Sequence, residues 1–343
     1  MGVRTQYEEA ATAGVEWLAA QLNDDGSYGE GIHDLACYYK SPYLFHLSGR
    51  AREASRLLTF IDLRFGREDH DFATSADQKS DNAAFNEYWA YPNGWIAMAA
   101  QRMGRFDIAY PAFTYLLSFH RPDVGGFLTN RPQGRGEAGT DVFTTAHLGL
   151  VCLYFGDIQR ASAAGRFVAR VLAMQRETLS GGFLLRLDHR GNLVRDIPEA
   201  AAAFHVVRVE APDQAYFMIG YPMAFLAKLF QATGDVAHLE AARDYLDFAL
   251  SCRGNLRTFY FSHKVAWGAA ALARITGDQR CVELATAIAD HLLEIQDPSG
   301  AWLTDQPAHT IFDQTAEIAI WLKEISAELE SAILPRQGAR SLG

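Results

Sequence analysis

Residues 225–252 (FLAKLFQATGDVAHLEAARDYLDFALSC) decide the fold, because residues 267–296 (WGAAALARITGDQRCVELATAIADHLLEIQ) repeat their pattern. In both stretches an apolar run ends at Thr-Gly-Asp. The segment that follows carries apolar residues at spacings of three and four, which is typical of an amphipathic helix. Glycine suits the left-handed end of one helix, and aspartate suits the start of the next. Each stretch therefore predicts a helical hairpin with a tight turn.

The same turn recurs along the chain about every fifty residues, a period typical of helical arrays. Glycine followed by Arg or Asp also occurs at residues 49–50, 104–105 and 156–157. A second repeated element places Gln before Gly, with an aromatic residue close by: residues 21–29, 175–183 and 296–302, and more loosely 120–127. Six helix pairs are predicted, each given as outer helix and then inner helix: 3–22 and 34–47, 50–65 and 85–103, 106–119 and 141–155, 158–175 and 213–233, 236–251 and 263–276, and 279–295 and 312–329.

The two kinds of helix differ in polarity. Outer segments such as 50–65 keep a charged face, whereas inner segments such as 221–230 are apolar nearly all round and must be buried. The pattern predicts an all-α (α/α)6 toroid of six helical hairpins, with an open superhelix of the same hairpins as the alternative. We expect one domain over residues 1–330 and a disordered tail at 331–343.

The composition limits the class of protein. The 343 residues carry a net charge of -10, and no run of Lys and Arg offers a surface for nucleic acid. No apolar run approaches the roughly 20 residues of a membrane span, and the N-terminus lacks the features of a signal peptide, so a cytoplasmic location is expected. The four cysteines lie far apart and are expected to be free thiols. Whether the chain forms a homo-oligomer stays open.

Loop lengths indicate where a site lies. The outer-to-inner connections are long, at residues 66–84, 120–140 and 176–212, and long loops gathered on one rim commonly carry function. The longest contains two alternating runs around His-Arg-Gly-Asn, which predict a small β-hairpin at residues 182–197. The pocket is therefore expected where the inner helices begin.

The hairpins and the Gln-Gly-aromatic elements resemble the terpenoid-cyclase and protein-prenyltransferase toroid superfamily, whose QW motifs lie between outer and inner helices. The best matches are residues 296–302 (QDPSGAW) and 21–29 (QLNDDGSYG). The DxDD of squalene-hopene-type cyclases is absent, and so are the zinc ligands of prenyltransferases and the Cys-His-Gly of lanthionine cyclases. Linalool dehydratase-isomerase has a similar toroid and works without a cofactor. Sugar 2-epimerases and some glycoside hydrolases share it as well, so the resemblance implies an enzyme without choosing the reaction.

Three residues at the start of the first inner helix are the first candidates for catalysis. Asp34, Cys37 and Tyr38 fall within about one turn, so Asp34 is a candidate proton donor and the other two are candidate proton acceptors. The alternative is that Asp34 caps the helix and Cys37 packs in the core.

Histidines on inner helices are the second candidates. His147 is expected to be either a base that faces the pocket or a satisfied core residue. His263 lies at a helix start, which favours its neutral form and suits a base or an electrophile. Asp313 and Glu317 are one turn apart, so one of their pKa values would be raised if both face the pocket.

The remaining candidates are expected to bind substrate or to line the pocket, with capping, ion pairing or core packing as the alternative for each. They are Tyr39, Glu87, Trp89, Trp95, Asp141, Thr144, His205, Tyr216, Tyr221, Trp267 and Asp313. No metal ligands and no cofactor are expected. The Gly-x-Gly-x-x-Gly at residues 134–139 has no βαβ unit around it and is interpreted as a loop.

Together these residues predict a cofactor-independent acid/base enzyme, an isomerase, cyclase or lyase, acting on an apolar terpene-like or polyketide-like small molecule. Aromatic walls of this kind hold cationic intermediates. A sugar epimerase or glycoside-processing enzyme is the first alternative. A non-catalytic binding toroid is the second, favoured if Asp34, His147 and His263 all point into helix contacts and side chains fill the cavity.

Overall fold

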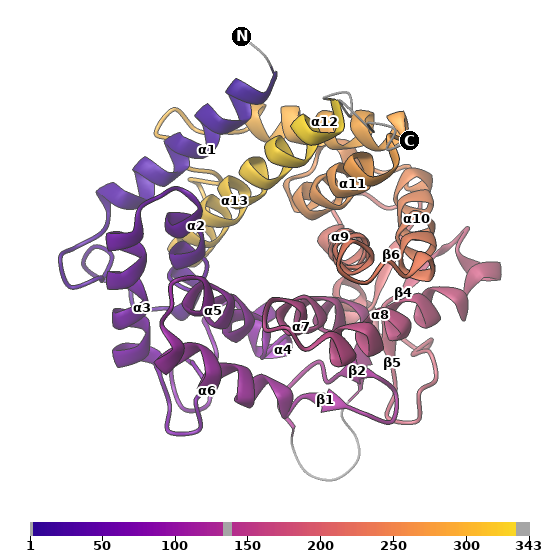
Figure 1. The fold of residues 1–343 in the computed structure, drawn as a ribbon, viewed down its shortest axis with the longest axis horizontal. Coiled ribbons are helices and arrows are strands. Elements are labelled where there is room, and N and C mark those ends of the chain that lie inside the picture. The colour runs from indigo at the N-terminus through magenta and orange to yellow at the C-terminus, as the bar shows by residue number, and fades with distance from the viewer. Residues whose placement is uncertain (1–2, 133–138, 334–343) are drawn as a thin grey trace, which may run out of the picture.

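The computed structural model describes residues 3–132 and 139–333, and their helices form a closed ring of two concentric layers (Figure 1). The outer layer contains α1 (Val3–Ala20), α3 (Ala51–Phe65), α6 (Phe106–Leu117), α8 (Ile158–Ala173), α10 (Val236–Ser251) and α12 (Gln279–Glu294). The inner layer contains η1 (Leu35–Cys37) with α2 (Ser41–Leu47), α4 (Ala83–Glu87) with α5 (Tyr91–Arg102), α7 (Val142–Tyr154), α9 (Phe217–Thr233), α11 (His263–Thr276) and α13 (Ala308–Ile333). Short 3-10 helices lie in the loops: η2 (Arg176–Thr178), η3 (Glu199–Phe204), η4 (Leu256–Thr258) and η5 (Tyr260–Ser262).

The tight turns form as predicted. Gly234 and Gly277 take the left-handed conformation, with φ of 72° and 70°, and their N–H groups bond back to the helices that they end. Asp235 and Asp278 then cap α10 and α12 by accepting backbone N–H bonds. In both hairpins, the glycine of Thr-Gly-Asp therefore ends one helix and the aspartate begins the next.

The ring is closed by the two ends of the described chain. Inner helices pack in the order α2, α5, α7, α9, α11 and α13, and α13 packs on α2 again. The outer helices after α1 each pack on the inner helix that precedes them in the sequence, whereas α1 packs on α13. The Gln-Gly-aromatic element at residues 296–302 fixes this junction, because Gln296 donates to the Ala10 carbonyl and the Trp302 indole donates to the Leu292 carbonyl. The toroid is confirmed, and the open superhelix is wrong.

Several predicted boundaries are wrong. The first two inner helices are each broken in two, and Pro42 and Pro92 mark the first turns of α2 and α5, where a missing N–H is tolerated. The fourth inner helix begins at Phe217, because Asp213 lies in the left-handed region with φ of 52°. The sixth begins at Ala308, before the predicted start at 312, and runs to Ile333, past the predicted end at 329. The rest of the predicted tail, and most of the glycine-rich loop at 134–139, lie outside the described residues.

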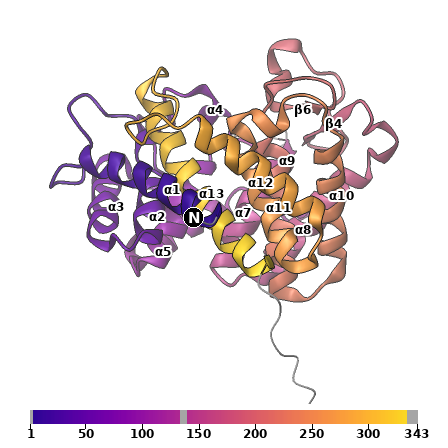
Figure 2. The same cartoon turned by 90° about the horizontal axis from the view of Figure 1, so that it is seen from above.

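The long loops carry short antiparallel strands at one end of the ring. Strands β1 (His120–Arg121) and β2 (Gly126–Phe127) pair, as do β3 (Thr140–Asp141) with β5 (Arg186–Leu187) and β4 (Gly182–Leu184) with β6 (Val206–Arg208). A bridge between Leu187 and Leu193 closes the predicted hairpin. Figure 2 places α4, β4 and β6 at this end and the C-terminal end of α13 at the other.

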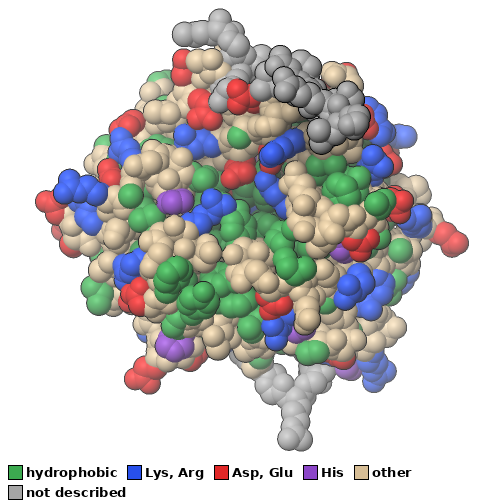
Figure 3. All heavy atoms as spheres, viewed as in Figure 1, with side chains coloured by type: hydrophobic (Ala, Val, Ile, Leu, Met, Phe, Trp, Pro, Cys, Tyr) green, Lys and Arg blue, Asp and Glu red, His purple; other side chains and the backbone are tan. Residues whose placement is uncertain are grey.

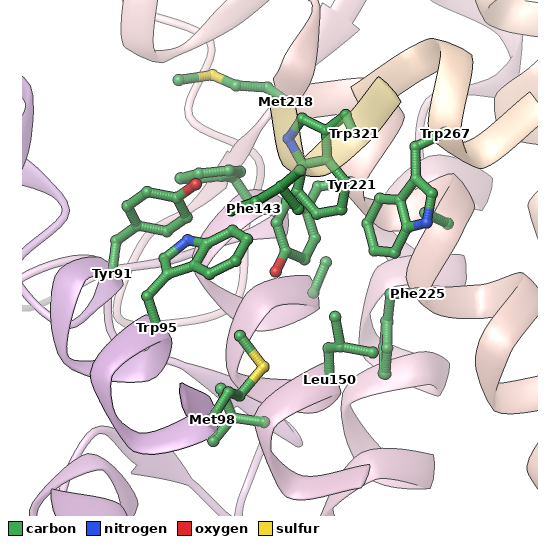
Figure 4. Packing of buried hydrophobic residues seen from close by; sticks show 14 of the residues in the cluster. Tyr91, Trp95, Met98, Phe143, Leu150, Met218, Tyr221, Phe225, Trp267 and Trp321 are labelled. Atoms are coloured by element: carbon green, nitrogen blue, oxygen red, sulfur yellow. The ribbon is translucent and has the colours of Figure 1, made fainter. Parts of the chain in front are cut away.

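Aromatic side chains fill the middle of the ring. The indoles of Trp267 and Trp321 stack with centroids 4.2 Å apart, and Trp95 and Tyr221 pack against Trp321 (Figure 4). Viewed along the ring, charged side chains of both signs are scattered over the surface and hydrophobic ones gather around its middle (Figure 3). In the described ranges, no helix combines the length and apolarity needed to cross a membrane.

Candidate active site

A small chamber lies where the inner helices begin. Every inner helix, or the loop just before it, contributes to its lining: Lys40, Asn82, Ala84, Phe85, Tyr88, Tyr91, Phe143, Phe217, Phe261, Lys264, Asp313, Gln314 and Glu317. Its volume is about 70 Å³. The predicted location of the pocket therefore agrees with the structure, but the space admits only a small reacting group unless the walls move.

The polar side of the chamber is a buried ion cluster centred on Glu317 in α13. The Glu317 carboxylate lies 2.5 Å from the Lys264 ammonium and also pairs with Lys40, which precedes α2. Nε2 of His263 lies 3.3 Å from the same carboxylate. These four side chains are all at most 3% exposed. One carboxylate therefore holds two buried ammonium groups.

Two neutral donors also hold Glu317. The Tyr91 hydroxyl donates to Oε1 at 3.1 Å, and the Trp321 indole N–H donates to it at 3.2 Å. Burial opposes ionisation of Glu317, but the positive charges of Lys264 and Lys40 outweigh it and hold its pKa well below the usual range. Glu317 is therefore a fixed negative charge and a poor proton acceptor.

Asp313 lies one turn before Glu317 and behaves differently. Its Oδ1 is 2.8 Å from the Lys40 ammonium, and its Oδ2 accepts a 2.8 Å hydrogen bond from the Gln314 amide. Burial raises the pKa of Asp313, the nearby Glu317 charge raises it further, and Lys40 opposes both. The predicted divergence of these two carboxyls agrees with the structure, and Asp313 is the one suited to exchange a proton.

Lys264 and His263 start α11, and burial favours their neutral forms. Burial lowers the pKa of Lys264 to about 8, since the attraction of Glu317 only partly compensates and Lys40 adds repulsion. Burial also lowers the pKa of His263 to about 4, with a further contribution from Lys264. Lys264 thus titrates near neutral pH, as general bases and nucleophiles do.

Asp34 is a helix cap outside the chamber lining. Its carboxylate accepts hydrogen bonds from the backbone N–H of Ala36, from the Ser80 hydroxyl and from the backbone N–H of Asp81. Cys37 is buried beside it, and burial raises the pKa of its thiol. Tyr38 donates to the Ile32 carbonyl and stacks in a buried aromatic group. Their contacts match the capping and packing alternative.

His147 is satisfied within the helix layer. The Tyr221 hydroxyl lies 2.7 Å from Nδ1, and the Tyr91 carbonyl lies 3.0 Å from Nε2. The carbonyl can only accept, so Nε2 carries the hydrogen and the Tyr221 hydroxyl donates to Nδ1. Burial lowers the pKa of His147 to about 3. Its two contacts tie α7 to α5 and α9, which is the core alternative.

Other candidates lie at the rim, where a separate open groove of about 860 Å³ is lined by Trp89, His205 and Arg186 among others. Glu87 pairs with Arg186 beside this groove. The Trp89 indole donates to Asp71 at 2.8 Å, and the Arg131 guanidinium lies over its ring. These residues form a polar surface distinct from the chamber.

The remaining predicted residues divide between capping and packing. Asp141 caps α7 through the Thr144 N–H, and burial raises its pKa. Tyr216 donates to the Ala211 carbonyl in its own loop. Two tryptophans, Trp95 and Trp267, belong to the aromatic centre below the chamber. Tyr39, by contrast, packs edge-on against Phe85 and Tyr91 of the chamber wall.

The sequence reasoning missed Lys40 and gave no role to Lys264. The sequence did contain a signal. Lysine is rare in this chain, at five of the 31 Lys and Arg residues. Lys40 ends the apolar stretch 35–39, and Lys264 lies in the apolar start of α11. A lysine placed among apolar residues is seldom buried without a partner. Such positions indicate an ion cluster even before the structure is known.

No family model matches this chain, and no curated protein matches it. Solved structures do. A variant of the type II terpene cyclase MstE from Scytonema, in complex with geranylgeranyl dihydroxybenzoate, is 15% identical with a TM-score of 0.57, covering 95% of this chain and 99% of that one. D-mannose isomerase is 10% identical with a TM-score of 0.68 and the same coverage. The GH76 α-mannanase from Bacteroides thetaiotaomicron is 14% identical with a TM-score of 0.62, covering 94% and 96%.

The chain has the α/α toroid fold. It shares this architecture over nearly its full length with a cyclase, an isomerase and a glycoside hydrolase, as the resemblance to the terpenoid-cyclase-like toroids implies. At such identities the similarity concerns the fold, and the chemistry must be argued from the chamber.

Proposed function

We propose that this protein is an acid/base enzyme, an isomerase, cyclase or lyase, that moves a proton next to a carbonyl group of a small, largely apolar molecule. The observation that carries the proposal is the buried cluster of two ammonium groups and two unlike carboxyls facing an aromatic wall. Titratable groups with perturbed pKa values in a pocket are typical of active sites.

The sign of the charge in the chamber favours a carbonyl substrate over a terpene cation. Lys40 and Lys264 would repel a carbocation, whereas their ammonium groups attract the oxygen of an enolate. Glu317 holds both ammonium groups in place. Asp313, with its raised pKa, is the candidate to deliver or accept the proton at the α-carbon. Among the substrates first considered, the polyketide-like one suits this arrangement better than the terpene-like one.

A sugar isomerase is the second candidate, and the open rim groove favours it. The groove offers Arg186, Asn86, Asn130 and Gln78 beside the ring of Trp89, a combination suited to a carbohydrate. The isomerisation of an aldose also moves a proton next to a carbonyl. The two candidates therefore share a reaction step and differ in the body of the substrate.

A non-catalytic toroid remains the third reading. Asp34 and His147 do make structural contacts, and aromatic side chains fill most of the ring. Two buried ammonium groups beside a pocket are costly for a purely structural element, since well-packed apolar residues would serve at least as well. This cost favours a functional role for the cluster.

Hydrogen-deuterium exchange tests the proposal without knowledge of the product. We would incubate the protein in deuterium oxide with 4-phenylbutan-2-one, whose α-hydrogens exchange slowly alone, and separately with D-mannose, and follow deuterium incorporation by NMR. Acceleration with the ketone, reduced in Asp313→Asn and retained in Glu324→Gln on the same helix, supports the apolar carbonyl substrate. Acceleration with D-mannose alone favours the sugar reading, and acceleration with neither contradicts the proposal.

A further inference from the structure

Lys264 has surroundings that set it apart from the other ammonium group in the chamber. In the described residues, Lys40 pairs with both Asp313 and Glu317, whereas the ion pairs of Lys264 are to Glu317 alone. Glu317 is shared between the two ammonium groups, so Lys264 has less than one full negative charge to compensate it. A lysine beside another cation and away from water is readily deprotonated.

Aromatic rings enclose the same ammonium group. The Lys264 Nζ lies 4.8 Å from the Phe217 ring centroid and 5.6 Å from that of Tyr91, with the Tyr221 and Phe143 rings at 5.8 and 5.9 Å. The side chain is 2% exposed, and Lys264 is among the residues that line the chamber. The amine therefore points to the space where the reacting group of a substrate would lie.

We infer that Lys264 is a nucleophile that forms an imine with the carbonyl carbon of the substrate. This inference rests on the proposed function and names the covalent step within it: Lys264 acts as the neutral amine, and Lys40 remains the ammonium group that attracts the carbonyl oxygen. The geometry points to Lys264 because its amine is in the chamber, is enclosed by rings and is held by one shared carboxylate.

The step balances with groups that the chamber contains. The neutral Lys264 amine adds to the carbonyl carbon, and the carbonyl oxygen takes a proton from Asp313. The nitrogen then gives up one proton to the Asp313 carboxylate, and Asp313 passes this proton to the hydroxyl oxygen. The C–O bond breaks with the oxygen leaving as water, and the nitrogen lone pair forms the C=N bond. The net change is ketone, neutral amine and the Asp313 proton to protonated imine, water and the Asp313 carboxylate, with no oxidant or reductant.

The ion cluster stabilises Lys264 both as the free ammonium group and as the protonated imine. A protonated imine carries one positive charge, as the ammonium does, so the ion pair with Glu317 is preserved. The positive nitrogen then withdraws electrons from the α-carbon, whose proton Asp313 is placed to accept. Gln314 Oε1 is buried in the lining without a hydrogen-bond partner among the described residues and offers an acceptor for the released water.

Reductive trapping tests the inference on the wild-type protein. We would add 4-phenylbutan-2-one with sodium cyanoborohydride, which reduces an imine to a stable secondary amine, and map the modified lysine by peptide mass spectrometry. Because the chain has only five lysines, the assignment is unambiguous. We expect modification at Lys264, and a rate that rises as the pH passes through about 8, where the amine loses its proton.

Variants separate this step from the proposed function. Lys264→Arg keeps the charge but removes the nucleophile, and it should lose the adduct and reduce α-hydrogen exchange by about 10²-fold or more. The matched control is Lys228→Arg, whose lysine pairs with Glu328 outside the chamber and whose replacement should change neither. If exchange persists in Lys264→Arg and no adduct forms at Lys264 in the wild type, the imine is wrong and the proposed function stands. If the wild type also fails to accelerate exchange, both fail.

Discussion

Asp34 and Asp313 are both buried aspartates on inner helices facing the same rim, yet their surroundings differ. Asp34 accepts hydrogen bonds from two backbone N–H groups and a hydroxyl, which all serve the fold. Asp313 accepts from the Lys40 ammonium and the Gln314 amide, both of them side chains, and it faces the chamber. Position in the repeat therefore does not distinguish a cap from the proposed catalytic acid. The number and kind of donors around the carboxyl do.

The largest expected effect is on stability at the chamber. Replacing Glu317 by Gln leaves two buried ammonium groups without their shared carboxylate, and breaking a buried pair costs about 3–5 kcal/mol. Urea denaturation measures the loss. The control is Glu16→Gln, which removes an exposed partner of Arg50 and should change the free energy of unfolding by under about 0.5 kcal/mol. Equal effects in the two variants would contradict the importance of the cluster.

The next effect concerns the cap. Asp34→Ala removes the acceptor for three donors and should lower the free energy of unfolding by about 2 kcal/mol. Exchange of the ketone probe per folded molecule should stay unchanged, because Asp34 is outside the chamber lining. If folded Asp34→Ala protein no longer exchanged the ketone probe, Asp34 would be the proton donor after all.

The smallest effect near neutral pH is a pH dependence from His147. Its pKa is about 3 in the folded protein and 6.5 in the unfolded chain, so only the unfolded chain binds a proton between these values. Stability should therefore fall as the pH drops below about 6.5, by at most about 1.4 kcal/mol per pH unit from this group. In His147→Gln, the slope measured by urea titration at several pH values should decrease by about one proton. An unchanged slope would mean that His147 is not buried in its neutral form.

Much of the fold was predictable because it depends on local chemistry. Thr-Gly-Asp specifies the turn, and all-round apolar helices must be inside, so the toroid followed from the repeat seen in residues 225–296, and the long loops at 66–84, 120–140 and 176–212 indicated the rim. Helix starts were less predictable. The sequence alone does not show whether Pro42 and Pro92 lie inside a longer helix or in the first turn of a shorter one.

The position of the chamber was predictable, but only some of the residues that line it were. Asp313 and the raised pKa beside Glu317 were expected from their spacing along one helix. Lys40 and Lys264 come from distant helices, and only closure of the ring brings both to Glu317. Asp34 and His147 carry suitable chemistry, but their partners lie on other elements that the sequence cannot pair with them.

The most direct measurement compares the same substitution at the two aspartates. Asp313→Asn and Asp34→Asn each remove one carboxyl charge, and α-hydrogen exchange of 4-phenylbutan-2-one is measured for both per folded protein. We predict that Asp313→Asn slows exchange by about 10²-fold or more while Asp34→Asn leaves it near the wild-type rate. Exchange that survives in Asp313→Asn and is lost in Asp34→Asn would contradict the assignment of the chamber as the active site.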